Sequence, residues 1–117
     1  MKVRIGFMPA AGQPADAGTF AATVDALEDL GFDSLWLSER VSGPNPDPIV
    51  GLAVAAGRTT RMKLGTSVQV LPGRNPALLA QELASLDVLS GGRFLPGFGL
   101  GGVDPHEQQA FGVTREE

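Results

Sequence analysis

The chain has 117 residues, 43% of them apolar and 19% charged, and a formal net charge of −4, which indicates a globular domain with one core. A nucleic-acid-binding surface needs clustered Lys and Arg, which this acidic chain lacks, and the absence of cysteine excludes disulfides, thiolate nucleophiles and Cys-ligated metals. Charges interrupt the apolar stretch over 1–8, and no apolar run approaches the roughly 20 residues of a membrane span, so we expect a cytoplasmic location and no membrane partner.

Strand and helix signals alternate along the first part of the chain. Apolar and polar residues alternate over 2–7, which predicts a strand. Apolar residues at helical spacing over 20–30 predict a helix, and Gly31 stands where a C′ glycine ends one. The short apolar run over 33–38 predicts a buried strand.

The same alternation continues in the second part. Two pairs, Asp47-Pro48 and Asn75-Pro76, each combine an N-cap residue with proline at the first helical position. The predicted elements here are a helix over 49–56, a strand over 62–70, a helix from 76 that stops at 91–92, a strand over 93–99, and the start of a helix over 105–111.

Strands separated by helices of this length favour parallel pairing with right-handed crossovers. Either an open doubly wound sheet or part of a barrel has this pattern. The units repeat at a spacing of about 30 residues, and four of them make half of an eight-unit (β/α)8 barrel of roughly 250 residues. Because no linker or low-complexity segment divides the chain, we expect one unit over 1–117.

In parallel α/β folds, ligands bind at the carboxyl ends of the strands. Glu39 and Arg40 directly follow the second predicted strand, and polar residues over 66–69 end the third. The carboxylate and guanidinium at 39 and 40 are able to hold polar edges of a ligand. The alternative is a solvated loop with an ion pair that contributes little energy.

Glycines cluster at the end of the fourth predicted strand. Gly97, Gly99 and Gly102 satisfy the G-x-G-x-x-G spacing of dinucleotide-binding domains, in which bare backbone approaches a pyrophosphate. The motif stands on the fourth strand and not the first, and Asp104-Pro105 delays the helix. We therefore favour the interpretation that the glycines let a ligand or another loop lie close to the strand end.

Three single residues complete the candidates. His106 is the only histidine, so it cannot build a histidine metal site alone; we expect a surface residue at a helix start and no metal. Trp36 lies within a predicted strand, where packing explains it better than ligand stacking. Pro96 removes a ladder hydrogen bond, so the fourth strand either becomes irregular early or lies at an edge.

Four stretches of the sequence carry a resemblance to a known family. They are 30–39 (LGFDSLWLSE), 63–68 (KLGTSV), 86–94 (LDVLSGGRF), and the glycine cluster 97–102 ahead of 110–113 (AFGV). In this order and spacing, the chain resembles the luciferase-like flavin oxidoreductases, which include bacterial luciferase-type monooxygenases and deazaflavin-dependent reductases. The run LDVLSGGR is the most specific of these signals.

The resemblance implies a TIM-barrel oxidoreductase, a monooxygenase or a hydride-transfer reductase, of which this chain is the N-terminal half with the first four βα units. It implies reduced FMN or the deazaflavin coenzyme F420, and we favour F420 because 66–68 and the glycine cluster look most like that branch. A non-proline cis peptide, here Ser67–Val68, would support the back of the ring, and Gly99 and Gly101 would border it.

The resemblance also has a departure at the end of the second strand. Many deazaflavin-dependent members have an acid followed by histidine there, where this chain has Glu39-Arg40. We keep Glu39 and Arg40 as the candidate catalytic residues. The loss of the histidine puts in doubt the proton handling usually attributed to it, because Arg40 can bind an anion but is a poor general base.

Barrels of this kind hold the cofactor phosphate with the loops after strands 7 and 8. We therefore expect the isolated chain 1–117 to bind no flavin tightly and to be inactive without the rest of the barrel. The first and fourth strands would be unpaired edges, which favours a homo-oligomer. The alternative from another class is a non-catalytic half-barrel that serves as a structural or assembly module.

Overall fold

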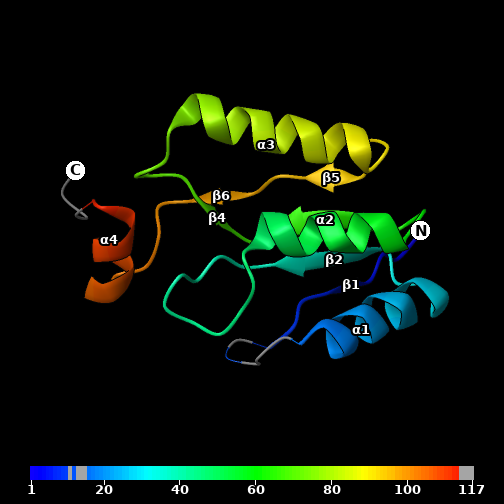
Figure 1. The fold of residues 1–117 in the computed structure, drawn as a ribbon. Coiled ribbons are helices and arrows are strands. Elements are labelled where there is room, and N and C mark those ends of the chain that lie inside the picture. Colours follow the sequence, from blue (N-terminus) through cyan, green and yellow to red (C-terminus); the bar gives the residue numbers. More distant parts are fainter. Residues whose placement is uncertain (11, 13–15, 114–117) are drawn as a thin grey trace.

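The protein is described by a computed structural model that covers residues 1–10, 12 and 16–113. Strands and helices alternate along it (Figure 1), in the order β1 (Gly6–Phe7), α1 (Ala17–Asp29), β2 (Ser34–Leu37), α2 (Pro48–Arg58), β3 (Lys63–Thr66), β4 (Gln69–Val70), α3 (Pro76–Leu89), β5 (Phe94–Leu95), β6 (Phe98–Gly99) and α4 (Pro105–Phe111). None of the helices in this part of the chain has the length and apolar character that crossing a membrane requires.

The strands form one main sheet and one short extension of it. The main sheet has the order β1-β2-β3-β5, with every neighbouring pair parallel. Beyond it, β4 pairs in parallel with β6, so that Gln69 lies opposite Phe98. The predicted parallel α/β order is confirmed, because sequential strands lie side by side with a helix in each connection.

Asx side chains fix where the helices begin. Asp47 accepts a hydrogen bond from the backbone N–H of Val50 at 3.0 Å, and Asn75 caps α3 in the same way, as the two Asx-Pro pairs predict. In α1, the Asp16 carboxylate accepts from the Thr19 N–H at 2.9 Å. This cap starts α1 at Ala17, earlier than the apolar spacing alone predicts.

The core lies between the main sheet and helices α1, α2 and α3. Leu35 and Leu37 point to this side of β2 and pack with helix residues such as Leu52, which is fully buried. Alternate residues of a strand face opposite sides, so Trp36 lies on the other face of the sheet. Its indole packs over Gly65, which confirms the expectation that Trp36 serves packing. Figure 1 shows α4 apart from these helices, at the end of the molecule where β4 and β6 lie.

The first strand is shorter than predicted. Pairing with β2 is confined to Gly6 and Phe7, while Val3 and Ile5 are 69% and 57% exposed. The strand predicted over 2–7 is therefore wrong in length, because its pairing with β2 begins only at Gly6. The backbone N–H of Ile5 instead donates a hydrogen bond to the Asp33 carboxylate at 2.8 Å.

The third and fourth predicted strands are each divided in two. The strand over 62–70 is interrupted at Ser67–Val68, where the peptide bond is cis as the resemblance implies. The strand over 93–99 is interrupted at 96–97, next to Pro96, where the Gly97 N–H donates to the Thr66 hydroxyl oxygen at 2.8 Å instead of a backbone carbonyl. Pairing then resumes as β4 with β6, and β5 is an outer strand of the main sheet. Both explanations offered for Pro96 therefore hold.

Two charged side chains hold the amino ends of the strands. The Arg93 guanidinium donates hydrogen bonds to the carbonyl oxygens of Ala56, Thr59, Met62 and Ser90, and to the Thr59 hydroxyl, at 2.7–3.0 Å. The Glu28 carboxylate accepts from the backbone N–H groups of 60–62, just before β3. These contacts lie at the amino ends of the strands, opposite to the carboxyl ends at which ligands are expected.

Candidate functional site at the carboxyl ends of the strands

The Ser67–Val68 bulge lies between β3 and β4, and the end of β2 holds it. The Ser67 N–H donates to the carbonyl oxygen of Leu37 at 2.8 Å, and the Glu39 N–H donates to that of Val68 at 3.1 Å. The hydroxyl of Ser38 donates to the carbonyl oxygen of Ser67. Ser67 and Val68 are themselves exposed, so the bulge faces open space at the strand ends.

Glycines stand beside the bulge because side chains would not fit. A Cβ added to Gly99 would lie 2.5 Å from a Val68 methyl group, and one added to Gly97 would lie 2.5 Å from the Thr66 carbonyl oxygen. Gly101 has φ +90°, a conformation that favours glycine. The structure thus brings Val68 and Gly99 into direct apposition and places Gly101 next along the same segment, beside Val70.

The predicted pair at the end of β2 separates into two different roles. The Glu39 side chain is 4% exposed, and its carboxylate is paired with Arg74 and not with its neighbour Arg40. Its Oε1 also accepts the N–H of Val70 at 2.8 Å. Arg40 is exposed, and its charge acts on the Glu107 carboxylate. The solvated-pair interpretation of 39 and 40 is therefore wrong for Glu39.

Arg74 is a residue of this region that sequence reasoning missed. Its Nε donates to the carbonyl oxygen of Val70 at 2.7 Å, and its guanidinium lies 5.7 Å from the centre of the Phe111 ring. With its amide oriented to satisfy both groups, Gln69 also accepts from Arg74. A single cation in the short loop between a strand end and the Asn75-Pro76 cap was the signal that could have identified it.

Glu107 is a second missed residue, and it fastens α4 to the loop after β2. Its carboxylate accepts the N–H groups of Ser42 at 2.7 Å and Val41 at 3.2 Å, together with the Ser42 hydroxyl. Burial raises the pKa of Glu107, but these hydrogen bonds and the charge of Arg40 outweigh burial and hold the pKa below its usual range. The signal was an acidic residue in the first turn of the predicted helix.

This lowered pKa predicts how stability depends on pH. The carboxylate of Glu107 stabilises the fold fully above the ordinary glutamate pKa of about 4.3, and the contribution is lost as pH falls through the lower folded pKa. Glu107→Gln cannot ionise and turns one amide NH2 toward a donor, so we expect a loss of about 1–2 kcal/mol at pH 7.

Thermal unfolding of both proteins between pH 7 and pH 3 measures this effect. The difference between the native protein and Glu107→Gln should shrink toward acid pH. A difference that stays constant over the whole range would show that the carboxylate charge contributes nothing.

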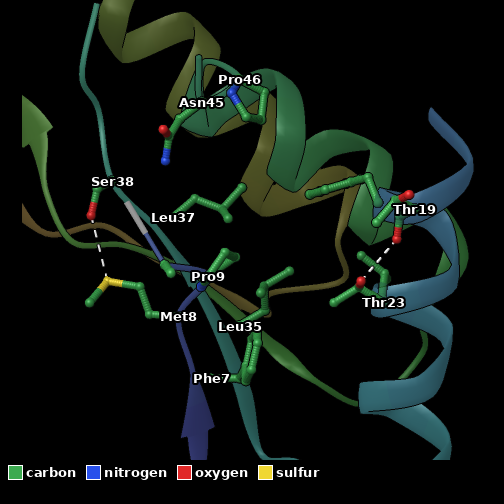
Figure 2. A pocket seen from close by; sticks show the side chains of 13 residues that line it. Phe7, Met8, Pro9, Thr19, Thr23, Leu35, Leu37, Ser38, Asn45 and Pro46 are labelled. Carbon is green, nitrogen blue, oxygen red and sulfur yellow. Dashed lines mark hydrogen bonds between the residues drawn. The ribbon is translucent and has the colours of Figure 1, made fainter. Parts of the chain in front are cut away.

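One cavity near these strand ends lies on the helix side of the sheet. It encloses about 340 Å³ and Figure 2 shows its largely apolar lining. The labelled lining residues are Phe7, Met8, Pro9, Thr19, Thr23, Leu35, Leu37, Ser38, Asn45 and Pro46. Leu35 and Leu37 belong to the core face, so this cavity lies between layers and apart from the face that carries Trp36.

The remaining candidates lie outside the apposed bulge and glycines. His106 is exposed at the start of α4, as expected of a helix-start residue. Its backbone N–H donates to the Asp104 carboxylate at 2.9 Å. Gly102, the last glycine of the dinucleotide pattern, precedes α4 by a short segment and does not open a helix directly. Among residues 1–10, 12 and 16–113, no group of three or more His, Cys, Asp or Glu side chains could hold a metal ion.

A parallel α/β unit with a bulge and bare glycine backbone at its strand ends belongs to the parallel α/β folds that bind ligands at the carboxyl ends of their strands. The particular family follows from a comparison with known families. The family model of the luciferase-like monooxygenases matches residues 2–117, and the chain belongs to this family. The resemblance inferred from the sequence is thereby confirmed.

Individual relatives show the same relationship. The F420-dependent glucose-6-phosphate dehydrogenase of Kineococcus radiotolerans is 36% identical over 98% of this chain and 35% of its own length. A monooxygenase structure from Streptomyces bottropensis has a TM-score of 0.83 and 33% identity, over 100% of this chain and 38% of that one.

A further structure supports the fold alone. The FMN complex of the oxygenating constituent of 3,6-diketocamphane monooxygenase from Pseudomonas putida has a TM-score of 0.85 at 24% identity, over 97% of this chain and 34% of that one. The chain thus spans about a third of the length of each of these three proteins. Their family is that of oxidoreductases built on a TIM barrel.

Proposed function

We propose that this chain forms the ring-supporting part of an F420- or FMN-dependent oxidoreductase, with Ser67, Val68, Gly99 and Gly101 facing the cofactor. The observation that carries the proposal is the exposed Ser67–Val68 bulge set directly against Gly99. An apolar side chain beside bare backbone suits a flat ring system. F420 is favoured over FMN, because the sequence around the bulge and the glycine cluster resembles the deazaflavin branch.

The side chains present at this edge fit such a cofactor. Val68 offers an apolar contact, and Gly101, next along the segment from Gly99, leaves backbone uncovered beside Val70. Arg40 offers an exposed positive charge after β2, which could hold an anionic edge of cofactor or substrate. When bound, a reduced cofactor of this kind supplies the two electrons of the reaction.

The reaction would be a monooxygenation or a hydride transfer on a small-molecule substrate, with Arg40 the candidate catalytic residue that faces solvent. We also propose a cytoplasmic location. We further propose a homo-oligomer, since β1 and β5 are the outer strands of the main sheet and, within the described residues, present unpaired edges. A monomer in size-exclusion chromatography would contradict the second point. The same outer strands would suit the alternative function, a non-catalytic assembly module.

Titration of the chain with F420 and with FMN, followed by cofactor fluorescence, tests the proposal. Because the chain spans about a third of its relatives' length, we expect weak but saturable binding, tighter for F420 than for FMN. The absence of any saturable binding at millimolar cofactor would favour the assembly module. Tight binding would overturn the expectation that the phosphate is held elsewhere.

A further inference from the structure

Glu39 has a buried carboxylate that contacts the backbone of Val70 and the guanidinium of Arg74. One oxygen accepts the Val70 N–H and the other is paired with Arg74, whose side chain is 23% exposed. The free energy lost when two charges leave water is often larger than the free energy gained from their attraction. The burial of this pair is therefore weak evidence that it stabilises the fold. What the pair does provide is a fixed geometry for the backbone that it contacts.

That backbone is the segment on the carboxyl side of the bulge. Glu39 contacts it twice, through its main-chain N–H to the carbonyl oxygen of Val68 and through its carboxylate to the N–H of Val70. Arg74 completes the arrangement by donating to the carbonyl oxygen of Val70. The two backbone groups of Val70 are therefore held by the two members of one ion pair.

The consequence for Val68 follows from its neighbours. Gly99 has no room for a side chain because Val68 already occupies the space, and a Cβ added to Gly101 would make a tight contact of 3.2 Å with a Val70 methyl group. A shift of the segment 68–70 would therefore move the surface that Val68, Gly99 and Gly101 share. The Arg74 guanidinium also lies over the ring of Phe111, 5.7 Å from its centre, so α4 contacts the same ion pair.

We propose that Glu39 is a positioning residue that, together with its partner Arg74, sets the place of Val68 against Gly99, and that it does not itself touch the cofactor. The inference rests on the proposed function in that the positioned surface is the one assigned to the cofactor ring. It also assigns a role in the same site to Arg74, which lies in the loop between β4 and α3.

The test compares Glu39→Ala and Glu39→Gln with Glu28→Ala in the full chain. Glu28 also binds backbone N–H groups of a loop, but at the amino end of β3, so it controls for a loss of stability without loss of position. The readouts are the nuclear Overhauser effect between the Val68 methyl groups and the Gly99 Hα protons, and the F420-induced shift of the Val68 amide signal.

We expect Glu39→Ala to reduce both signals strongly and Glu39→Gln to reduce them less, because glutamine can still accept from Val70 but carries no charge to pair with Arg74. Glu28→Ala should lower the unfolding midpoint and leave both signals intact. Arg74→Met should reproduce Glu39→Ala, and the double variant should lose no more than either single one, since both act on one contact.

Two results separate this inference from the proposed function. If the native chain shows no F420-induced shifts, the proposed function fails, while the contact between Val68 and Gly99 still reports on positioning. If Glu39→Ala and Glu39→Gln keep that contact and the shifts of the native chain, the positioning role is wrong.

Discussion

Replacing Arg93 with methionine should lower the free energy of unfolding by about 3 kcal/mol or more. The guanidinium donates to the carbonyl oxygens of Ala56, Thr59, Met62 and Ser90, at the end of α2, before β3 and after α3. Methionine preserves much of the aliphatic packing but leaves these acceptors without their donor. Removing one partner of a hydrogen bond that is shielded from water costs the desolvation of the other, and here several partly buried acceptors lose their partner together.

Urea denaturation of Arg93→Met and Arg58→Met measures the effect. Arg58 pairs with Asp25 on the surface, where both side chains are more than 40% exposed, so its replacement should change stability far less. The urea midpoint should fall for Arg93→Met with an unchanged slope. Equal midpoints for the two variants would show that the Arg93 contacts do not hold the helix and strand ends together.

Replacing Gly65 with alanine should have the second largest effect. Gly65 is buried in the middle of β3, and an added Cβ would lie 2.3 Å from two carbon atoms of the six-membered ring of Trp36. The indole would have to move, and overpacking of this kind typically lowers the free energy of unfolding by about 1–3 kcal/mol. Because Trp36 is the only tryptophan, its emission should shift to the red as the ring becomes exposed.

Gly57→Ala is the matched control for this substitution. Gly57 lies in α2 with no atom within 4 Å of an added Cβ, so alanine there should stabilise the helix by up to about 1 kcal/mol. The same chemical change should therefore have opposite signs at the two positions. A Gly65→Ala protein with native stability and native emission would contradict the packing of Trp36 described above.

The order of elements could be predicted from the sequence because local signals fix it. The caps at Asp47 and Asn75 and the stop at 91–92 are short-range features, and each stands where the structure has a helix boundary. The family could be recognised for a similar reason, since the run 86–94 joins a helix end, a glycine stop and a strand. Parallel pairing follows from that order through general rules of chain connection.

The chemistry of the strand ends could be predicted in part. The sequence placed Ser67, Val68 and Gly99 at neighbouring strand ends, and the structure brings them together. It did not show that Glu39 turns away from Arg40 toward Arg74, because that pairing joins residues 35 positions apart. Neither periodicity nor local spacing reports on contacts of this range.

The length of the first strand was wrong for a related reason. Alternation along a strand indicates which side chains share a face, and burial depends on whether another element covers that face. Val3 alternates correctly with its neighbours and is nevertheless exposed. The break at Pro96 shows the opposite case, in which one residue type carries enough local information to predict an interruption of the ladder.

The central claim is that a flat cofactor lies on the surface made by Val68, Gly99 and Gly101, and amide chemical-shift mapping tests it most directly. The ¹⁵N-labelled chain is titrated with F420, and the shifts are assigned to residues. We predict that the largest shifts occur over 67–69 and 99–101, with few around the cavity lined by Thr23 and Asn45. Saturable shifts centred on that cavity, with 67–69 unaffected, would contradict the account.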